Sequence, residues 1–144
     1  MTPDLFFSAG SSLALTGWIA LVLAALVTPA RRWALRWAGL AIPALLAAAY
    51  VLLIVQGRSA FDEGGFSSIA AVRALFANDA ALTAGWLHYL AFDLFVGTWI
   101  VREGREAGMP GWVLLIPLPL TFLFGPAGLL TFFILRPILG RRSS

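Results

Sequence analysis

The sequence predicts an all-α, polytopic membrane protein: a four-helix transmembrane bundle with a short amphipathic helix between spans two and three. Hydrophobic residues make up 60% of the 144 residues and charged residues only 12%. Soluble domains are about half apolar and a quarter charged. Four apolar segments reach the ~20 residues that a helix needs to cross a bilayer. The connections are mostly short, so we treat residues 1–144 as a single transmembrane domain.

The four predicted spans are residues 5–28, 37–56, 80–101 and 112–135. The sequences "PARRWALRW" and "REGREAGMPG" join spans one to two and three to four. Segment 57–79 is longer and differs from these two connections. Ser67 or Ser68 can cap a helix there that runs to about Phe76. Its apolar residues fall on one face at helical spacing: Ile69, Val72, Leu75 and Phe76. We interpret this helix as an interfacial connector or as a lid over the bundle.

Composition also excludes several classes of function. The chain has no cysteine, which excludes disulfides, thiol catalysis and cysteine-ligated metals. The net charge of +3 is spread over loops, so we expect no nucleic-acid partner. All ten basic residues are arginine, a bias typical of GC-rich genomes. We therefore expect a multi-pass protein of a bacterial inner (cytoplasmic) membrane, in contact with membrane lipid and able to form homo-oligomers.

Arginines do not decide the orientation of four spans, because five would lie on each side of the membrane. The first hairpin often dominates, which favours an external N-terminus. A re-entrant fourth segment would break the tie, because the C-terminal arginines would change sides. With four spans the two groups are Arg31, Arg32, Arg36, Arg102 and Arg105, and Arg58, Arg73, Arg136, Arg141 and Arg142.

The fourth segment, "WVLLIPLPLTFLFGPAGLLTFFILRP", contains three prolines, each of which removes a backbone donor. A kink inside a membrane is tolerated where protein or trapped water satisfies the freed carbonyls. We therefore expect the kink at "FGPAG" to face the bundle. It either packs helices closely through Thr121, Gly125 and Gly128, or it shapes a ligand cavity.

The third span carries two ionisable side chains, Asp93 and the only histidine, His88. Five helical steps separate them by about 140°, so they make a poor metal pair and could either flank a ligand or each meet a different neighbouring helix. Asp93 lies near the bilayer centre, where a carboxylate costs ~3 kcal/mol. It should face the bundle, as a neutral acid or paired with Arg73 or Arg136. Both groups are either functional or structural hydrogen-bonding residues.

Asp93 shares its helix face with three residues that we predict to line a ligand groove opposite the kinked fourth segment. We expect no metal and no cofactor at this site. The predicted ligand-binding residues are Trp86, Tyr89, Gly97, Phe122, Gly125, Pro126 and Gly128.

Several stretches resemble the abscisic-acid-deficient-four-like family, whose plastid members are associated with neoxanthin synthesis. They are "FSSIAAVRALFANDAALTAGW", "WLHYLAFDLFVGTWI", "REAGMP" and "TFLFGPAGLL". The resemblance covers roughly residues 66–136 and is strongest with small bacterial members. The first two spans show only generic hydrophobicity.

The resemblance implies a role in carotenoid biosynthesis, as an isomerase that converts a carotenoid 5,6-epoxide into an allenic alcohol. Such a reaction needs an acid to protonate the epoxide oxygen and a base to remove a proton from the polyene, without a redox cofactor. Asp93 would be the acid and His88, neutral near pH 7, the base. The ligand would be a carotenoid or related isoprenoid.

Two other functions fit the sequence. The chain could be a non-catalytic membrane component that binds a lipid or pigment or assists pigment enzymes. It could also be a small proton-coupled carrier with Asp93 as its relay, although one central carboxylate per chain is sparse for that role.

Overall fold

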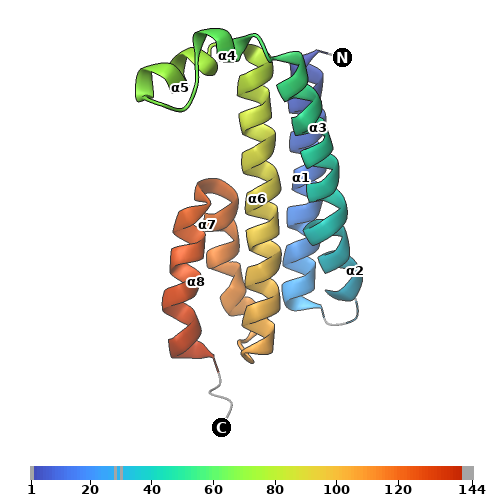
Figure 1. Ribbon diagram of the computed structural model, residues 1–144. Helices are drawn as coiled ribbons and strands as arrows, with labels where there is room; N and C mark the ends of the chain where they lie inside the picture. The colour runs from blue at the N-terminus through green and yellow to red at the C-terminus, as the bar shows by residue number, and fades with distance from the viewer. Residues whose placement is uncertain (1, 28, 30, 141–144) are drawn as a thin grey trace.

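The computed structural model describes residues 2–27, 29 and 31–140, and all of its regular elements in these ranges are helices (Figure 1). The predicted end of the first span at Thr28 lies outside the described residues, as do Arg141 and Arg142. The elements are α1 (Pro3–Leu26), α2 (Arg31–Arg36), η1 (Trp37–Ala41), α3 (Ile42–Gln56), α4 (Ala60–Glu63), α5 (Ile69–Leu75), α6 (Asp79–Glu106), η2 (Gly111–Leu115), α7 (Pro117–Phe124) and α8 (Pro126–Leu139).

Three helices are long and apolar enough to cross a membrane. They are Pro3–Leu26, Arg31–Gln56 and Asp79–Glu106, of 24, 26 and 28 residues. The second combines α2, η1 and α3, and its middle part, Trp37–Ala41, is a π-helical turn. This wide turn ends just before Pro43, which cannot donate a hydrogen bond to the carbonyl four residues earlier. The first three predicted spans are therefore confirmed as long apolar helices.

The core forms where α1 and α3 pack on α6. Gly10 and Gly17, seven residues apart on α1, receive the side chains of Leu87 and Leu94, also seven apart on α6. A Cβ on Gly17 would lie 2.6 Å from Leu94 Cδ2. Small residues let membrane helices approach closely, and the seven-residue repeat keeps this seam between the same two helices. The α1–α6 pair thus forms a close-packed backbone for the site.

The predicted fourth span, residues 112–135, does not form one continuous helix. It is divided into η2, α7 and α8, and α7 and α8 lie side by side in opposite directions (Figure 1). The reason is local: Gly125 has φ +40°, and Pro126 follows it as the first residue of α8. The 14-residue α8 would span only about 21 Å, against a hydrocarbon core of about 30 Å.

The C-terminal end of α8 lies near the C-terminal end of α6, which is also where the chain enters η2. Arg136 in α8 pairs with Glu103 in α6 at 2.8 Å, and a Cβ on Gly140 would lie 3.4 Å from Ala107 Cβ. The described chain therefore has three helices long and apolar enough to cross a membrane and a helical hairpin, formed by η2, α7 and α8, whose two ends lie at the same end of the molecule. We call it the re-entrant hairpin.

The predicted helix between spans two and three is confirmed as α5. Ser68 caps it by accepting a hydrogen bond from the Ala71 amide at 3.1 Å. Leu75 is buried and clusters with Ala60 of α4 and Ala81 of α6, whereas Ile69 at the start of the helix is exposed. The α4–α5 segment thus rests on the start of α6, at the opposite end of the molecule from the base of the hairpin (Figure 1).

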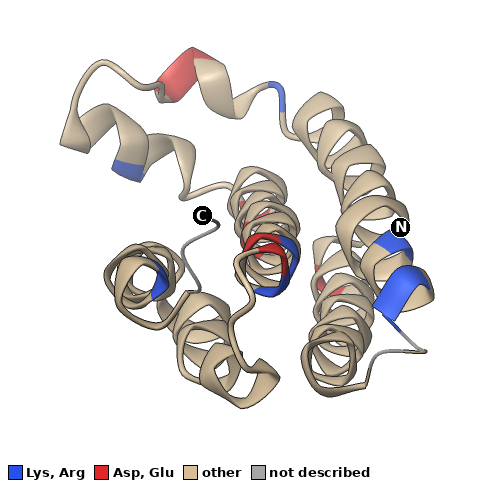
Figure 2. Cartoon of the chain, turned by 90° about the horizontal axis from the view of Figure 1, so that it is seen from below, with Lys and Arg blue, Asp and Glu red and all other residues tan. Residues whose placement is uncertain are grey.

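This topology gathers arginines at one end of the molecule, which Figure 2 views end-on, with basic positions on α2, α6 and α8. Among the described residues, Arg136 joins five other arginines at the end where α6 finishes, whereas only Arg58 and Arg73 lie at the other end. The tie between the two sides is broken, and the positive-inside rule predicts that the arginine-rich end faces the cytoplasm. The six arginines are Arg31, Arg32, Arg36, Arg102, Arg105 and Arg136.

The re-entrant hairpin makes a labelling prediction that the cysteine-free sequence makes easy to test. Glu106→Cys and Leu139→Cys should react with a membrane-impermeant maleimide from the same side, and Ser67→Cys only from the opposite side. In intact cells we expect Ser67→Cys alone to react, with the other two reacting after permeabilisation. If Leu139→Cys reacted from the same side as Ser67→Cys, the fourth segment would cross the membrane and the chain would have four spans.

Candidate functional site

The tip of the re-entrant hairpin lies against the middle of α6. Gly125 ends α7 by donating to the Thr121 carbonyl at 2.9 Å, and its own carbonyl accepts from Gly128 and Leu129 at 3.1 and 3.3 Å. Only glycine adopts its backbone angles, φ +40° and ψ −91°, without strain. Gly125 is therefore both the C-cap residue of α7 and the N-cap residue of α8.

Asp93 meets this turn directly. A Cβ placed on Gly125 would lie 2.8 Å from Asp93 Oδ1 and 3.0 Å from Oδ2, so the carboxyl occupies the space that any other residue would need. Oδ2 is buried and has no hydrogen-bond partner among the described residues. An unsatisfied carboxyl oxygen at this depth is the most unusual polar feature of the span.

Tyr89 stabilises the same turn. Pro126 has no N–H, so the Phe122 carbonyl, four residues earlier, loses its helical partner. The Tyr89 hydroxyl donates to that carbonyl at 3.2 Å. The Trp86 ring stacks on Tyr89 at 5.5 Å between centroids, and its Nε1 donates to Ser11 Oγ at 2.9 Å. An aromatic wall therefore links α1, α6 and the hairpin beside Asp93.

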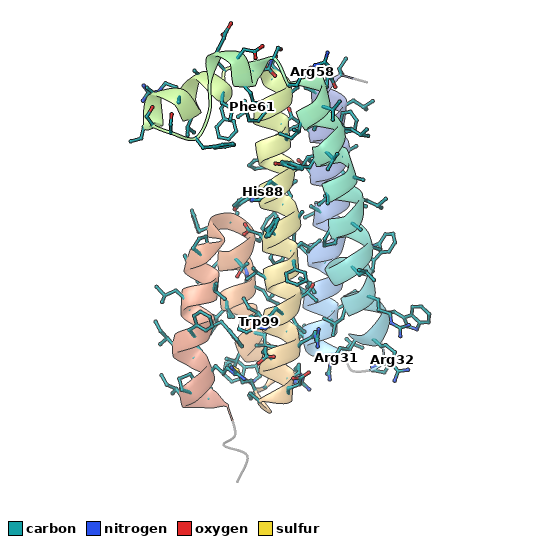
Figure 3. All side chains as sticks on the ribbon, viewed as in Figure 1. Arg31, Arg32, Arg58, Phe61, His88 and Trp99 are labelled. Atoms are coloured by element: carbon teal, nitrogen blue, oxygen red, sulfur yellow. The ribbon has the colours of Figure 1, made fainter. Side chains whose placement is uncertain are left out.

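His88 belongs to a different surface of α6. It is exposed, stacks on Phe92 with ring centroids 4.5 Å apart and approaches Tyr50 of α3 at 5.9 Å. Figure 3 shows it on α6 between the levels of Phe61 and Trp99. His88 and Asp93 therefore meet different neighbours, which is one of the two arrangements that their spacing allowed.

A cavity of about 340 Å³ opens beside His88. It lies between α3, the α4–α5 segment and α6, so the predicted amphipathic helix forms one of its walls. Sequence reasoning missed this cavity, because the loop aromatics Phe61 and Phe66 gave no helical periodicity to place them. The lining residues are Tyr50, Ile54, Phe61, Phe66, Leu75, Phe76, Ala81, Gly85 and His88.

The remaining predicted ligand-binding residues lie mainly in helix contacts. A Cβ on Gly97 would be 2.8 Å from the Trp18 ring, and Gly128 is pressed against Thr121 inside the hairpin. The Phe122 ring packs on Trp18 with centroids 5.4 Å apart, and Pro126 is exposed. Of the predicted set, the structure brings Gly125 and Tyr89 to Asp93, and Trp86 stacks on Tyr89.

The predicted charge partners do not reach Asp93. Arg136 pairs with Glu103 instead, because the hairpin returns α8 to the arginine-rich end rather than carrying it across the bilayer. Arg73 is exposed on α5 and makes no ion pair in the described part of the chain. Over residues 2–27, 29 and 31–140 no group of three His, Asp or Glu side chains could hold a metal ion.

Comparison with known protein families matches residues 5–132 to the family described as ABA DEFICIENT 4-like. The chain belongs to this family. The match includes the first two spans, where the sequence itself showed only generic hydrophobicity, and the hairpin that carries the "FGPAG" turn. No curated protein matches this chain, and no solved structure matches it.

The contact between Asp93 and Gly125 predicts a strong effect of one methyl group. Gly125→Ala should destabilise the protein by about 1–3 kcal/mol, because it adds backbone strain and a clash with the carboxyl. Gly65→Ala is the matched control, since a Cβ there has nothing within 4 Å. Thermal unfolding in detergent measures both, and equal unfolding temperatures for the two variants would contradict the described contact.

Proposed function

We propose that this protein is a membrane enzyme that isomerises a carotenoid epoxide or a related isoprenoid by acid–base chemistry. The observation that carries the proposal is the Asp93 carboxyl, held against Gly125 within the bilayer with a buried, unpartnered oxygen. Family membership and the resemblance to neoxanthin-associated members support the substrate class. We also propose a bacterial cytoplasmic membrane as the location, with the arginine-rich end inside.

The proposed reaction conserves all atoms and electrons. Asp93 donates its proton to the epoxide oxygen, one carbon–oxygen bond of the ring breaks, and the oxygen remains on the other carbon as an alcohol. The base removes a proton from the adjacent polyene, and the electrons of that carbon–hydrogen bond form the new double bond of the allene. Proton transfer by positioned side chains contributes typically 10²–10⁴-fold to a rate.

His88 is the proposed base because it lines the aromatic cavity on the open side of α6. The proton that the base removes lies on the carbon next to the epoxide, so the proposal requires that end of the substrate to lie on the surface of α6 between Asp93 and His88, which are about 140° apart around the helix. Apolar walls with few convergent polar groups are typical of small-molecule sites. The substrate would reach this region laterally from the bilayer, since the neighbouring Phe92 is exposed.

A second candidate function is non-catalytic binding of a pigment or lipid. An apolar groove of about 290 Å³ runs between α1 and α7, and a hydrocarbon chain could occupy it without any chemistry. Its lining has no ionisable side chain. The lining residues are Leu15, Trp18, Ile19, Val22, Leu23, Leu118, Pro119 and Phe122.

Pigment analysis separates these two functions. We expect the wild-type chain, expressed in a bacterium that accumulates carotenoid epoxides, to produce a new isomer detectable by chromatography. Asp93→Asn should lower its formation at least ~100-fold, because the amide cannot donate the acidic proton, and His88→Ala should lower it similarly. Glu106→Gln, an exposed acid on the same helix, should not change it.

Protein levels in the membrane fraction control for expression. Full conversion by Asp93→Asn would exclude Asp93 as the acid. Pigment that co-purifies unchanged with every variant would favour the binding function over the enzyme.

A further inference from the structure

A second groove lies at the arginine-rich end, on the surface where α2 and η1 meet α6. Its volume is about 350 Å³, and it is separate from the Asp93 contact and from the cavity beside His88. Each wall is one helical face, with residues spaced three or four apart along the chain. The lining residues are Arg32, Leu35, Arg36, Gly39 and Leu40 from α2 and η1, and Phe95, Thr98, Trp99 and Arg102 from α6.

Three arginines line the charged end of this groove, and the Arg36 guanidinium also lies 5.8 Å from the centroid of the Trp33 ring. Arg32, Arg36 and Arg102 are all exposed, and none of them forms an ion pair with a carboxylate in the described part of the chain. Glu103, which follows Arg102, pairs with Arg136 on the hairpin. Three positive charges around one hollow favour an anion, and guanidinium groups suit phosphate oxygens in particular.

The other end of the groove is apolar and lies deeper in the membrane. Phe95 precedes Arg102 by two helical turns, or about 10 Å along α6 towards the bilayer centre. On the opposite wall, Leu40 likewise lies closer to the bilayer centre than Arg32 and Arg36 do. Leu40 and Phe95 are 70% and 56% exposed, so they offer an uncovered surface to a hydrocarbon chain.

The charged end of the groove therefore lies nearer the membrane surface and the apolar end lies deeper, which is the arrangement of the headgroup and acyl chains of a phospholipid. We propose that this groove binds an anionic phospholipid of the cytoplasmic leaflet. Its phosphate contacts Arg32, Arg36 and Arg102, and one acyl chain lies over Leu40, Phe95 and Trp99. A basic pocket between transmembrane helices on the cytoplasmic side is the kind of site that binds lipid headgroups. This site is independent of the proposed chemistry at Asp93.

Native mass spectrometry of the full chain in detergent tests the site with two lipids of identical acyl chains, phosphatidylglycerol and phosphatidylcholine. We expect phosphatidylglycerol to bind at least tenfold more tightly. The triple variant Arg32→Gln, Arg36→Gln, Arg102→Gln should lose about fivefold in phosphatidylglycerol affinity per arginine, on the order of 100-fold in total. Its affinity for phosphatidylcholine should fall less, because the choline cation offsets the charge of the phosphate.

The matched control is Arg58→Gln with Arg73→Gln, which removes arginines at the opposite end and should leave the selectivity intact. Arg102→Gln alone, losing about fivefold, keeps the test valid if the triple variant is poorly folded. Equal binding of the two lipids, or unchanged selectivity in the arginine variants, would overturn the proposal.

Two competitors distinguish the sources of phosphate. Glycerol phosphate, which lacks acyl chains, should not displace phosphatidylglycerol at equal concentration, because it cannot contact Leu40 and Phe95. Displacement by it would mean a site for free phosphate esters, and tighter binding of geranylgeranyl diphosphate would mean a prenyl diphosphate site. Either result would overturn the phospholipid assignment.

Discussion

A helix that breaks inside a bilayer must find its hydrogen-bond partners within the protein, because lipid tails offer none. The break at Gly125 and Pro126 meets this constraint through α6. Tyr89 donates to the Phe122 carbonyl that Pro126 leaves without a partner, and Asp93 fills the space beside Gly125. The tip of the hairpin is therefore attached to one level of α6, and this attachment determines how deep the hairpin reaches.

The hairpin's limited depth explains the two other features of the molecule. Because α8 returns to its starting side, Arg136 joins the other arginines near the end of α6, and the charge asymmetry follows. Because α7 and α8 cover only part of α6, His88 and Phe92 remain exposed beyond the tip. The α4–α5 segment approaches that region from the other end and completes an aromatic cavity. One break thus produces both the orientation signal and the open region of the candidate site.

Much of this arrangement could be predicted from the sequence. Continuous apolar length indicated the three spans, the pair Ser67 and Ser68 indicated the start of α5, and helical spacing separated His88 from Asp93. The fourth segment could not be resolved in this way, because Pro126 and Gly125 predict a break equally well for a kink and for a reversal. The contacts that Tyr89 and Asp93 make with the turn favour a reversal. They join residues far apart in the sequence, so a local sequence pattern does not reveal them. The error about Arg136 follows from the same cause, since a crossing α8 would have carried it to the opposite side.

A distance between the ends of α6 and α8 tests the re-entrant hairpin most directly. Spin labels on Glu106→Cys and Leu139→Cys, in the cysteine-free chain reconstituted in a bilayer, report that distance by double electron–electron resonance. We expect a single short distance, well below the ~30 Å thickness of the hydrocarbon core. A distance of about 30 Å or more would mean that α8 crosses the membrane, and would contradict the contact between Gly125 and Asp93 on which the candidate site depends.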